Sequence, residues 1–271
     1  MGKGLHHPNG LIERIALIGG PGGGKTRGWL SIADMARKTK SDAQFYVIDT
    51  DFAVDRMLAE GFPKLLDDGR VHIETPFDFP EYKAAGEKFR KKMGPNDWLI
   101  VDLMNHAWEE VQNHYSNEVF GKSKGDYFLE VRKGLKDTSK GFQAFEGWTD
   151  WNIIKPMYSD FANGVYFKHR GHTLICTSAR PVDRGSRGKQ SASPKEIIQT
   201  FGHLGFYPDG EKRTAHNVHT VLLMQQKDEE TWVMSTGKDR ERKRHVNTLL
   251  GPDDGQFVKN YLIKTAGWKV N

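Results

Sequence analysis

The sequence predicts an α/β fold in which a mainly parallel sheet is flanked by helices and ends in an antiparallel hairpin. Short apolar runs, typical of buried parallel strands, alternate with stretches of helical spacing. A glycine-rich segment at 19–24 joins the first apolar run to the first helical stretch. Two later apolar runs flank a short charged turn at 226–230, which is the pattern of a hairpin.

The expected elements follow one another in a βαβ order. The predicted strands are 15–18, 45–48, 71–74, 98–101, 173–177, 218–225 and 231–234, and the clearest predicted helices are 28–38, 55–60 and 81–92. Strand, helix and strand in this order indicate right-handed crossovers and therefore parallel strands. The last two strands are expected to pair as the hairpin at the edge of the sheet.

Length and composition indicate one main domain. A chain of 271 residues with 37% hydrophobic side chains can bury one sizeable α/β core but is too short for two large domains. The expected organisation is an N-terminal tail at 1–10, the main domain at 11–245 and a C-terminal extension at 246–271. Within the main domain we expect a helical insertion at about 103–170 and a basic, loop-like excursion at about 181–217.

Net charge and cysteine content limit the partners, the covalent cross-links and the cellular location that this chain can have. The net charge of +5 is compatible with a polyanionic partner such as nucleic acid, and also with an ordinary soluble protein. Cys176 is the only cysteine, which excludes an intrachain disulfide framework and a cysteine-rich metal site. Because the first nine residues are polar and no long apolar run occurs, the expected location is the cytoplasm.

One motif carries most of the functional information. Residues 19–26 read G-G-P-G-G-G-K-T and fit G-x-x-x-x-G-K-[ST], the phosphate-binding loop or P-loop, between a strand and a helix. Glycines let successive N–H groups point at phosphates, and the helix N-terminus adds its positive end. Lys25 is expected to reach the β- and γ-phosphates, and Thr26 to ligate Mg²⁺. The predicted nucleotide-binding residues are Gly19, Gly20, Pro21, Gly22, Gly23, Gly24, Lys25, Thr26 and Arg27.

Acidic residues at two strand ends complete the expected hydrolytic site. Asp102 ends the apolar run 98–101 and is expected to anchor Mg²⁺ together with Thr26. Many P-loop ATPases have a glutamate directly after this aspartate, but Leu103 stands there, so the catalytic carboxylate must come from elsewhere. Asp51 would lie beside Asp102 if the two strands pair, and would position a water for in-line attack. For Asp49, a role in the site and a role as a helix cap or turn residue both remain open.

Three segments resemble the RecA family of ATPases. Residues 45–55, F-Y-V-I-D-T-D-F-A-V-D, resemble the segment whose second acid activates water, with Asp51 at that position where RecA has Glu. Residues 173–180, T-L-I-C-T-S-A-R, resemble the strand whose polar tip senses the γ-phosphate, with Ser178 at the sensor position where RecA has Gln. Lys238-Asp239-Arg240 resembles the K-x-R element that RadA-like and DnaB-like ATPases extend to a neighbour's γ-phosphate.

The resemblance covers about residues 11–245 and is closest to small, phage-encoded RecA-like ATPases of recombination and single-strand annealing. It implies a Mg²⁺-dependent ATP hydrolase that binds single-stranded DNA and forms a homo-oligomer, in which Lys238 and Arg240 act across the subunit interface. For a phage-encoded protein the expected location is the cytoplasm of the host cell. The catalytic residues that the pattern and the resemblance together predict are Lys25, Asp51, Asp102, Ser178, Lys238 and Arg240.

A basic loop occupies the place of the family's second DNA-binding loop. Arg184, Arg187 and Lys189 supply cations suited to backbone phosphates, and glycine and serine supply flexible donors. Lys212 and Arg213 in the return segment add charge. A solvated basic loop without a ligand remains an equal alternative.

Two other functions share the same P-loop. In a small-molecule kinase, the stretch 180–189 would serve as a lid over an acceptor pocket. In an ATP-switched assembly factor, Trp108, Trp148 and Trp151 would form a surface for protein partners, although tryptophans at such spacing more often belong to a core.

Overall fold

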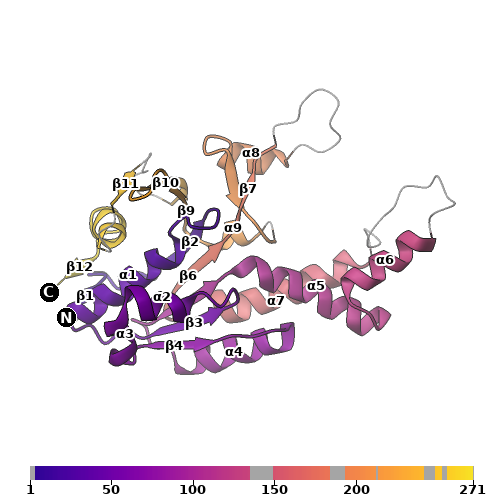
Figure 1. Ribbon diagram of the computed structural model, residues 1–271, viewed down its shortest axis with the longest axis horizontal. Helices are drawn as coiled ribbons and strands as arrows, with labels where there is room; N and C mark the ends of the chain where they lie inside the picture. The colour runs from indigo at the N-terminus through magenta and orange to yellow at the C-terminus, as the bar shows by residue number, and fades with distance from the viewer. Residues whose placement is uncertain are drawn as a thin grey trace.

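An eight-stranded sheet forms the centre of the computed structural model, which describes residues 4–134, 149–183, 193–211, 213–240, 248–251 and 255–270. Its strands are β2 (Arg14–Ile18), β3 (Phe45–Asp49), β4 (Val71–Glu74), β5 (Trp98–Asp102), β6 (His172–Thr177), β9 (Thr220–Gln226), β10 (Trp232–Asp239) and β11 (Thr248–Leu250). The order across the sheet is β11-β10-β9-β2-β6-β5-β3-β4. The strands from β9 to β4 are parallel, and β10 and β11 are antiparallel (Figure 1).

Helices cover both faces of this sheet. The long helices are α1 (Lys25–Lys38), α2 (Val54–Gly61), α4 (Phe79–Lys92), α5 (Met104–Phe120), α6 (Lys124–Gly134) and α7 (Trp151–Ala162). Shorter ones are α3 (Pro63–Asp68), α8 (Lys195–Phe201), α9 (Thr214–Asn217), and the π-helical turns η1 (Asn163–Phe167) and η2 (Val258–Ile263). Within the described ranges, no helix combines the length and the apolarity needed to cross a membrane.

Successive side chains along each central strand pack into two separate hydrophobic cores, one on each face of the sheet. Ile15 and Leu17 of β2 belong to the core under α1, α2, α3 and η2, whereas Ala16 and Ile18 belong to the core under α4, α5, α7 and η1. Successive side chains of a strand point to opposite faces, so a strand buried on both faces must be apolar throughout. This is why β2, β3 and β5 each contain four apolar residues in a row, and β6 has its apolar residues at 174–176 between two threonines.

The predicted fold class is confirmed: the sheet is mainly parallel, has helices on both faces and ends in antiparallel strands. Every predicted strand is present, and most ends agree within two residues. One difference concerns the edge. The β9–β10 hairpin lies one strand inside it, because β11 pairs with β10 and forms the edge itself. Three residues are too few to give β11 a periodic pattern in the sequence.

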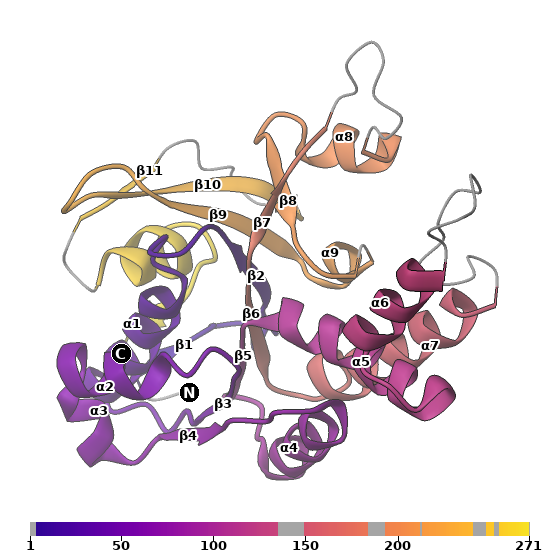
Figure 2. The same ribbon diagram turned by 45° about the vertical axis from the view of Figure 1, so that its right-hand side comes forward.

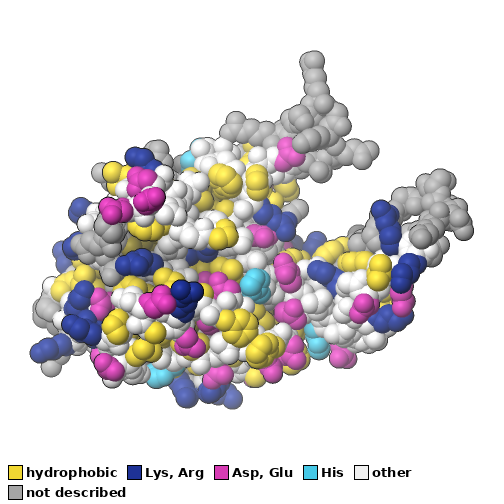
Figure 3. Space-filling model, in the orientation of Figure 1, with side chains coloured by type: hydrophobic (Ala, Val, Ile, Leu, Met, Phe, Trp, Pro, Cys, Tyr) yellow, Lys and Arg dark blue, Asp and Glu magenta, His cyan; other side chains and the backbone are white. Residues whose placement is uncertain are grey.

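Two projections leave the body of the molecule on the same side. Helices α5, α6 and α7 extend as an arm, and β7 (Ala179–Pro181), β8 (Phe206–Pro208) and α8 form a second lobe above it (Figures 1 and 2). The surface is indented between the arm and this lobe (Figure 3). Away from them, β1 (Leu5–His6) pairs with β12 (Lys269–Val270).

Candidate active site

The P-loop joins the end of β2 to the start of α1, and its glycines are required by close contacts. A Cβ on Gly19 or Gly23 would lie 2.2 Å or 2.7 Å from the carbonyl oxygen of Met224 on β9. Gly22 and Gly24 have φ angles of 71° and 91°, which side chains rarely adopt. The glycine spacing therefore follows both from the turn itself and from its approach to a neighbouring strand.

Lys25 folds back over the loop that precedes it. Its Nζ donates to the carbonyl oxygens of Gly19 and Gly20, both at 3.0 Å, and the side chain is buried. The ammonium group thus lies against the backbone that is predicted to bind the phosphates.

Asp102 joins the end of β5 to helix α1. Its Oδ2 accepts a hydrogen bond from Thr26 Oγ1 at 2.8 Å and another from Trp29 Nε1 at 3.1 Å. Burial raises the pKa of this carboxyl group, and the two hydrogen bonds act against that shift because they stabilise its charged form. Thr26 and Asp102 were predicted to lie together. Trp29 was not, since a tryptophan at a helical core position gives no sign of a polar partner.

The two acidic strand ends lie side by side. Asp49 of β3 is in register with Asp102 of β5, so the strands pair as expected. Asp49 Oδ2 accepts from the backbone N–H of Val54 at 3.2 Å and so caps the start of α2. Burial raises the pKa of Asp49 to about 7, and the charges of Asp51 and Asp102 add to this shift.

A cleft of about 400 Å³ collects most of the predicted site residues. It is lined by Pro21 to Arg27 of the P-loop and α1, and by Asp51, Ala53, Met57, Asp102, Leu103, Ser178 and Trp232. Asp51 is exposed, and the next residue, Phe52, is also exposed with a φ of 58°. A bulky residue in this conformation is strained, and such strain is concentrated at functional sites. The loop that carries Asp51 is therefore held in an unusual shape beside the P-loop.

The tip of β6 is tied to the lobe formed by β7 and β8. Thr177 Oγ1 donates to Asn105 Oδ1 at 3.3 Å and to the carbonyl oxygen of Asp209 at 2.9 Å. The N–H of Asp209 donates to the carbonyl oxygen of Ser178 at 2.9 Å, and Asp209 also forms an ion pair with Arg180. Asn105 was not predicted, although its place three residues after Asp102, at the start of a helix, is a signal that could have been used.

Lys238 and Arg240 lie away from the cleft of their own chain. Lys238 Nζ donates to the carbonyl oxygens of Ala215 and Val218 at 2.6 Å and 2.8 Å, and Arg240 donates to that of His216 at 3.1 Å. These bonds close the end of α9. Burial, with a smaller contribution from Arg240, lowers the pKa of Lys238 to about 8.

Strand β10 separates these cations from the P-loop. Trp232, at its start, donates from Nε1 to the carbonyl oxygen of Gly22 at 2.9 Å. Lys238 lies six residues further along the strand, a distance of about 20 Å. Between them the pairing with β9 shifts by one residue at Gly237, a β-bulge. Lys238 consequently pairs with Val221 and lies on the face of the sheet that packs against α5. Trp232 lies on the opposite face, which packs against α1.

The predicted DNA-binding residues are only partly described. Arg213 lies exposed just before α9, outside the cleft. Arg184, Arg187, Lys189 and Lys212 lie outside the described residues.

The residues of the cleft fit a magnesium ion. Oδ1 of Asp49 and Oδ1 of Asp102 are buried, and within the described part of the chain neither has a hydrogen-bond partner. Buried polar atoms are rarely left without a partner, and Mg²⁺ prefers oxygen ligands. The Thr26 hydroxyl and the Asp102 carboxylate thus offer oxygen ligands beside the P-loop, and Asp49 stands next to Asp102 on the neighbouring strand without lining the cleft.

Comparison with known proteins adds little to this geometry. No family model matches the chain, and no curated protein matches it. A crystal structure of the RadB recombinase is similar, with a TM-score of 0.49 and 12% sequence identity, over 90% of this chain and 89% of that one.

The raised pKa of Asp49 predicts a stability that depends on pH. The folded state holds the proton up to about pH 7, whereas the unfolded chain releases it near pH 4. The stabilisation is complete below about pH 4 and is lost as the pH rises through 7. Asp49→Asn keeps an acceptor for Val54 and cannot titrate, so its Tm, measured without nucleotide or Mg²⁺, should fall less than that of the wild type between pH 5 and pH 8. Equal falls would contradict the assignment.

Proposed function

We propose that this chain is a Mg²⁺-dependent ATPase of RecA-like type that binds single-stranded DNA and assists phage-type recombination or annealing. One observation carries the proposal: the P-loop, the Thr26–Asp102 pair and Asp51 surround a single cleft. Each supplies what phosphoryl transfer to water needs, namely backbone donors for the phosphates, oxygen ligands for the metal, and an exposed carboxylate.

The residues divide the work by their chemistry. Lys25 leaves the carbonyl oxygens of Gly19 and Gly20 for the β- and γ-phosphate oxygens and stabilises the charge that develops there. Thr26 and Asp102 hold Mg²⁺, which neutralises phosphate charge when bound. Asp51 accepts a hydrogen bond from the water that attacks the γ-phosphorus, while the bond to the bridging oxygen of ADP breaks.

The DNA-binding part of the proposal follows the connections of β6. Ser178 lines the cleft, and its backbone is bonded to Asp209 in the lobe from which the basic loop at 184–194 departs. A change in contact between Ser178 and the γ-phosphate would therefore reach that loop through the ends of β7 and β8. In this way nucleotide state would alter the affinity for DNA.

The trans-acting role of Lys238 and Arg240 fits their distance from the cleft. Cations some 20 Å along β10 from the P-loop cannot serve the nucleotide of their own chain. In a homo-oligomer they would stabilise the γ-phosphate of a neighbour, after leaving the carbonyl oxygens at the end of α9.

Lys25→Ala should abolish nearly all ATP hydrolysis, because the variant lacks the ammonium group that stabilises the developing phosphate charge. Phosphate release with MgATP and no added acceptor is the measurement, and Lys38→Ala at the end of the same helix is the matched control. Release by the wild type without an acceptor also argues against the kinase alternative. A Lys25→Ala rate near that of the wild type would contradict the proposed role.

Mixing two inactive variants tests the role of Arg240. Arg240→Ala should bind MgATP normally but hydrolyse it poorly, whereas Lys25→Ala keeps Arg240 and lacks a working P-loop. If Arg240 acts across an interface, a mixture pairs an intact P-loop with an intact Arg240 and regains part of the activity. The double variant mixed with Arg240→Ala is the control: it offers intact P-loops without any Arg240 and should regain none. No recovery in the test mixture would refute the trans role.

The logarithm of the binding constant for a labelled single strand should fall linearly with the logarithm of the salt concentration. The binding constant should also differ between the nucleotide-free, ADP-bound and ATP-bound protein. Replacing Arg184, Arg187 and Lys189 together by alanine should reduce the salt slope by about 2, since each phosphate contact on a single strand contributes about 0.7. Replacing the exposed Lys64, Lys91 and Lys92 is the matched control. Absence of binding at low salt in every nucleotide state would eliminate the DNA-binding proposal and favour an ATP-switched assembly factor.

A further inference from the structure

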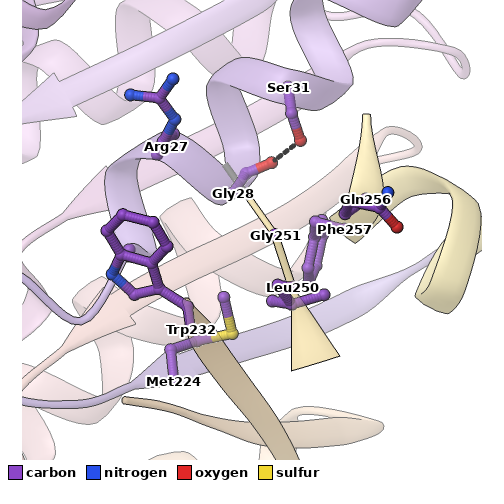
Figure 4. Close-up of a pocket in the computed structure, with 10 residues that line it drawn as sticks. Arg27, Gly28, Ser31, Met224, Trp232, Leu250, Gly251, Gln256 and Phe257 are labelled. Carbon is purple, nitrogen blue, oxygen red and sulfur yellow. Dashed lines mark hydrogen bonds between the residues drawn. The ribbon is translucent and has the colours of Figure 1, made fainter. Parts of the chain in front are cut away.

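A second, smaller pocket lies beside the P-loop, where the start of α1 faces β10 and the segment that leads into η2. Its volume is about 40 Å³. Trp232 lies on one side and Phe257 on the other, with Leu250 of β11 below and Gly28 of α1 above (Figure 4). Its walls thus come from segments far apart in the sequence.

Two glycines at the start of α1 line this space. Gly24 is the N-cap residue, with a φ of 91°, and Gly28 lies one turn further along the chain. A Cβ on Gly24 would lie 3.3 Å from Cδ1 of Trp232. A Cβ on Gly28 would lie 3.2 Å from Cδ1 of Leu17 and 3.9 Å from Cγ of Phe257, so the lack of a side chain lets α1 pack closely on β2 at the wall of the pocket.

The pocket adjoins the phosphate cleft. Gly24, Arg27 and Trp232 line both. The guanidinium of Arg27 lies over the ring of Phe62, 5.8 Å from its centroid, and in Figure 4 it points away from the pocket. A nucleotide whose phosphates occupy the P-loop can therefore extend its nucleoside past Gly24 into this pocket.

The walls have the chemistry that a nucleobase requires. Two aromatic rings and a leucine offer stacking and apolar contact, and Gln256 offers an amide at the rim. Asn260 Nδ2 donates to Gln256 Oε1 at 3.2 Å, which holds this amide in one position.

We propose that this pocket holds the nucleobase of the bound nucleotide between Trp232 and Phe257, with Gln256 bonded to the edge of the base. The inference rests on the proposed nucleotide-binding function and adds where the base is recognised. A volume of 40 Å³ admits about three water molecules, which is less than a base. The indole therefore moves aside as the base enters, and its hydrogen bond to Gly22 breaks. Recognition of the base is thereby linked to the backbone of the P-loop.

Calorimetric titration with MgATP and with magnesium tripolyphosphate, which has no base, tests the proposal. Trp232→Ala and Gln256→Ala should each weaken MgATP, the tryptophan variant by roughly tenfold or more, because stacking on an aromatic side chain is lost. Both should bind tripolyphosphate as the wild type does. Leu249→Ala, on the same strand as Leu250 but exposed, is the matched control and should change neither affinity.

Trp232→Phe separates stacking from the bond to Gly22. It keeps a ring and loses the indole N–H, so it should bind MgATP within a few-fold of the wild type. If the indole moves as the base enters, MgATP should change the tryptophan fluorescence of the wild type, and this variant should lose that part of the change.

Three outcomes would overturn the inference. Variants that bind MgATP as tightly as the wild type would show that the base lies elsewhere. Equal losses for MgATP and tripolyphosphate would show that Trp232 only supports the P-loop. A wild type that binds neither ligand would instead refute the proposed function, and this inference with it.

Discussion

The arrangement of the cleft depends on Asp102 and its two hydrogen bonds to α1. Strand β6 lies between β2 and β5, so the P-loop and Asp102 leave the sheet from strands that are not neighbours. Thr26 and Trp29 of α1 cross this gap and bind the same carboxylate oxygen. A buried carboxylate is costly without partners, and its preference for them fixes the rotation of α1 about its axis. Lys25, the neighbour of Thr26, is positioned by the same contact.

The central strands and the P-loop could be predicted from the sequence, because each depends on residues that are close together in the chain. Strands buried on both faces must be apolar throughout, which made β2, β3, β5 and β6 recognisable. Parallel pairing then placed Asp49 opposite Asp102, and the glycine spacing marked the P-loop. The very short strands β1, β11 and β12 carry no period, and their pairing depends on the rest of the fold already being in place.

The parts that escaped prediction are tertiary contacts of single side chains. Trp29 binds Asp102, Asn105 receives the Thr177 hydroxyl, and Trp232 binds the carbonyl of Gly22. Each joins residues more than seventy positions apart, and no spacing rule connects them. Asp49 accepts the N–H of Val54 at the start of α2 and also lies close enough to Asp51 and Asp102 to be affected by their charges. One carboxyl group therefore makes the helix-cap contact and belongs to the acidic group at the strand ends.

The bulge at Gly237 decides which face of the sheet Lys238 occupies. In a regular strand of the same length, Trp232 and Lys238 would share one face, and Lys238 would pair with Thr220 on the α1 side of the sheet. A Cβ at Gly237 would lie 3.1 Å from Leu204 and Phe201, so a glycine also suits the packing here. The bulge thus places an aromatic ring and a cation, six residues apart, on opposite faces of one strand. Deletion of Gly237 would make the strand regular and leave Lys238 opposite Val221, on the face that it now occupies.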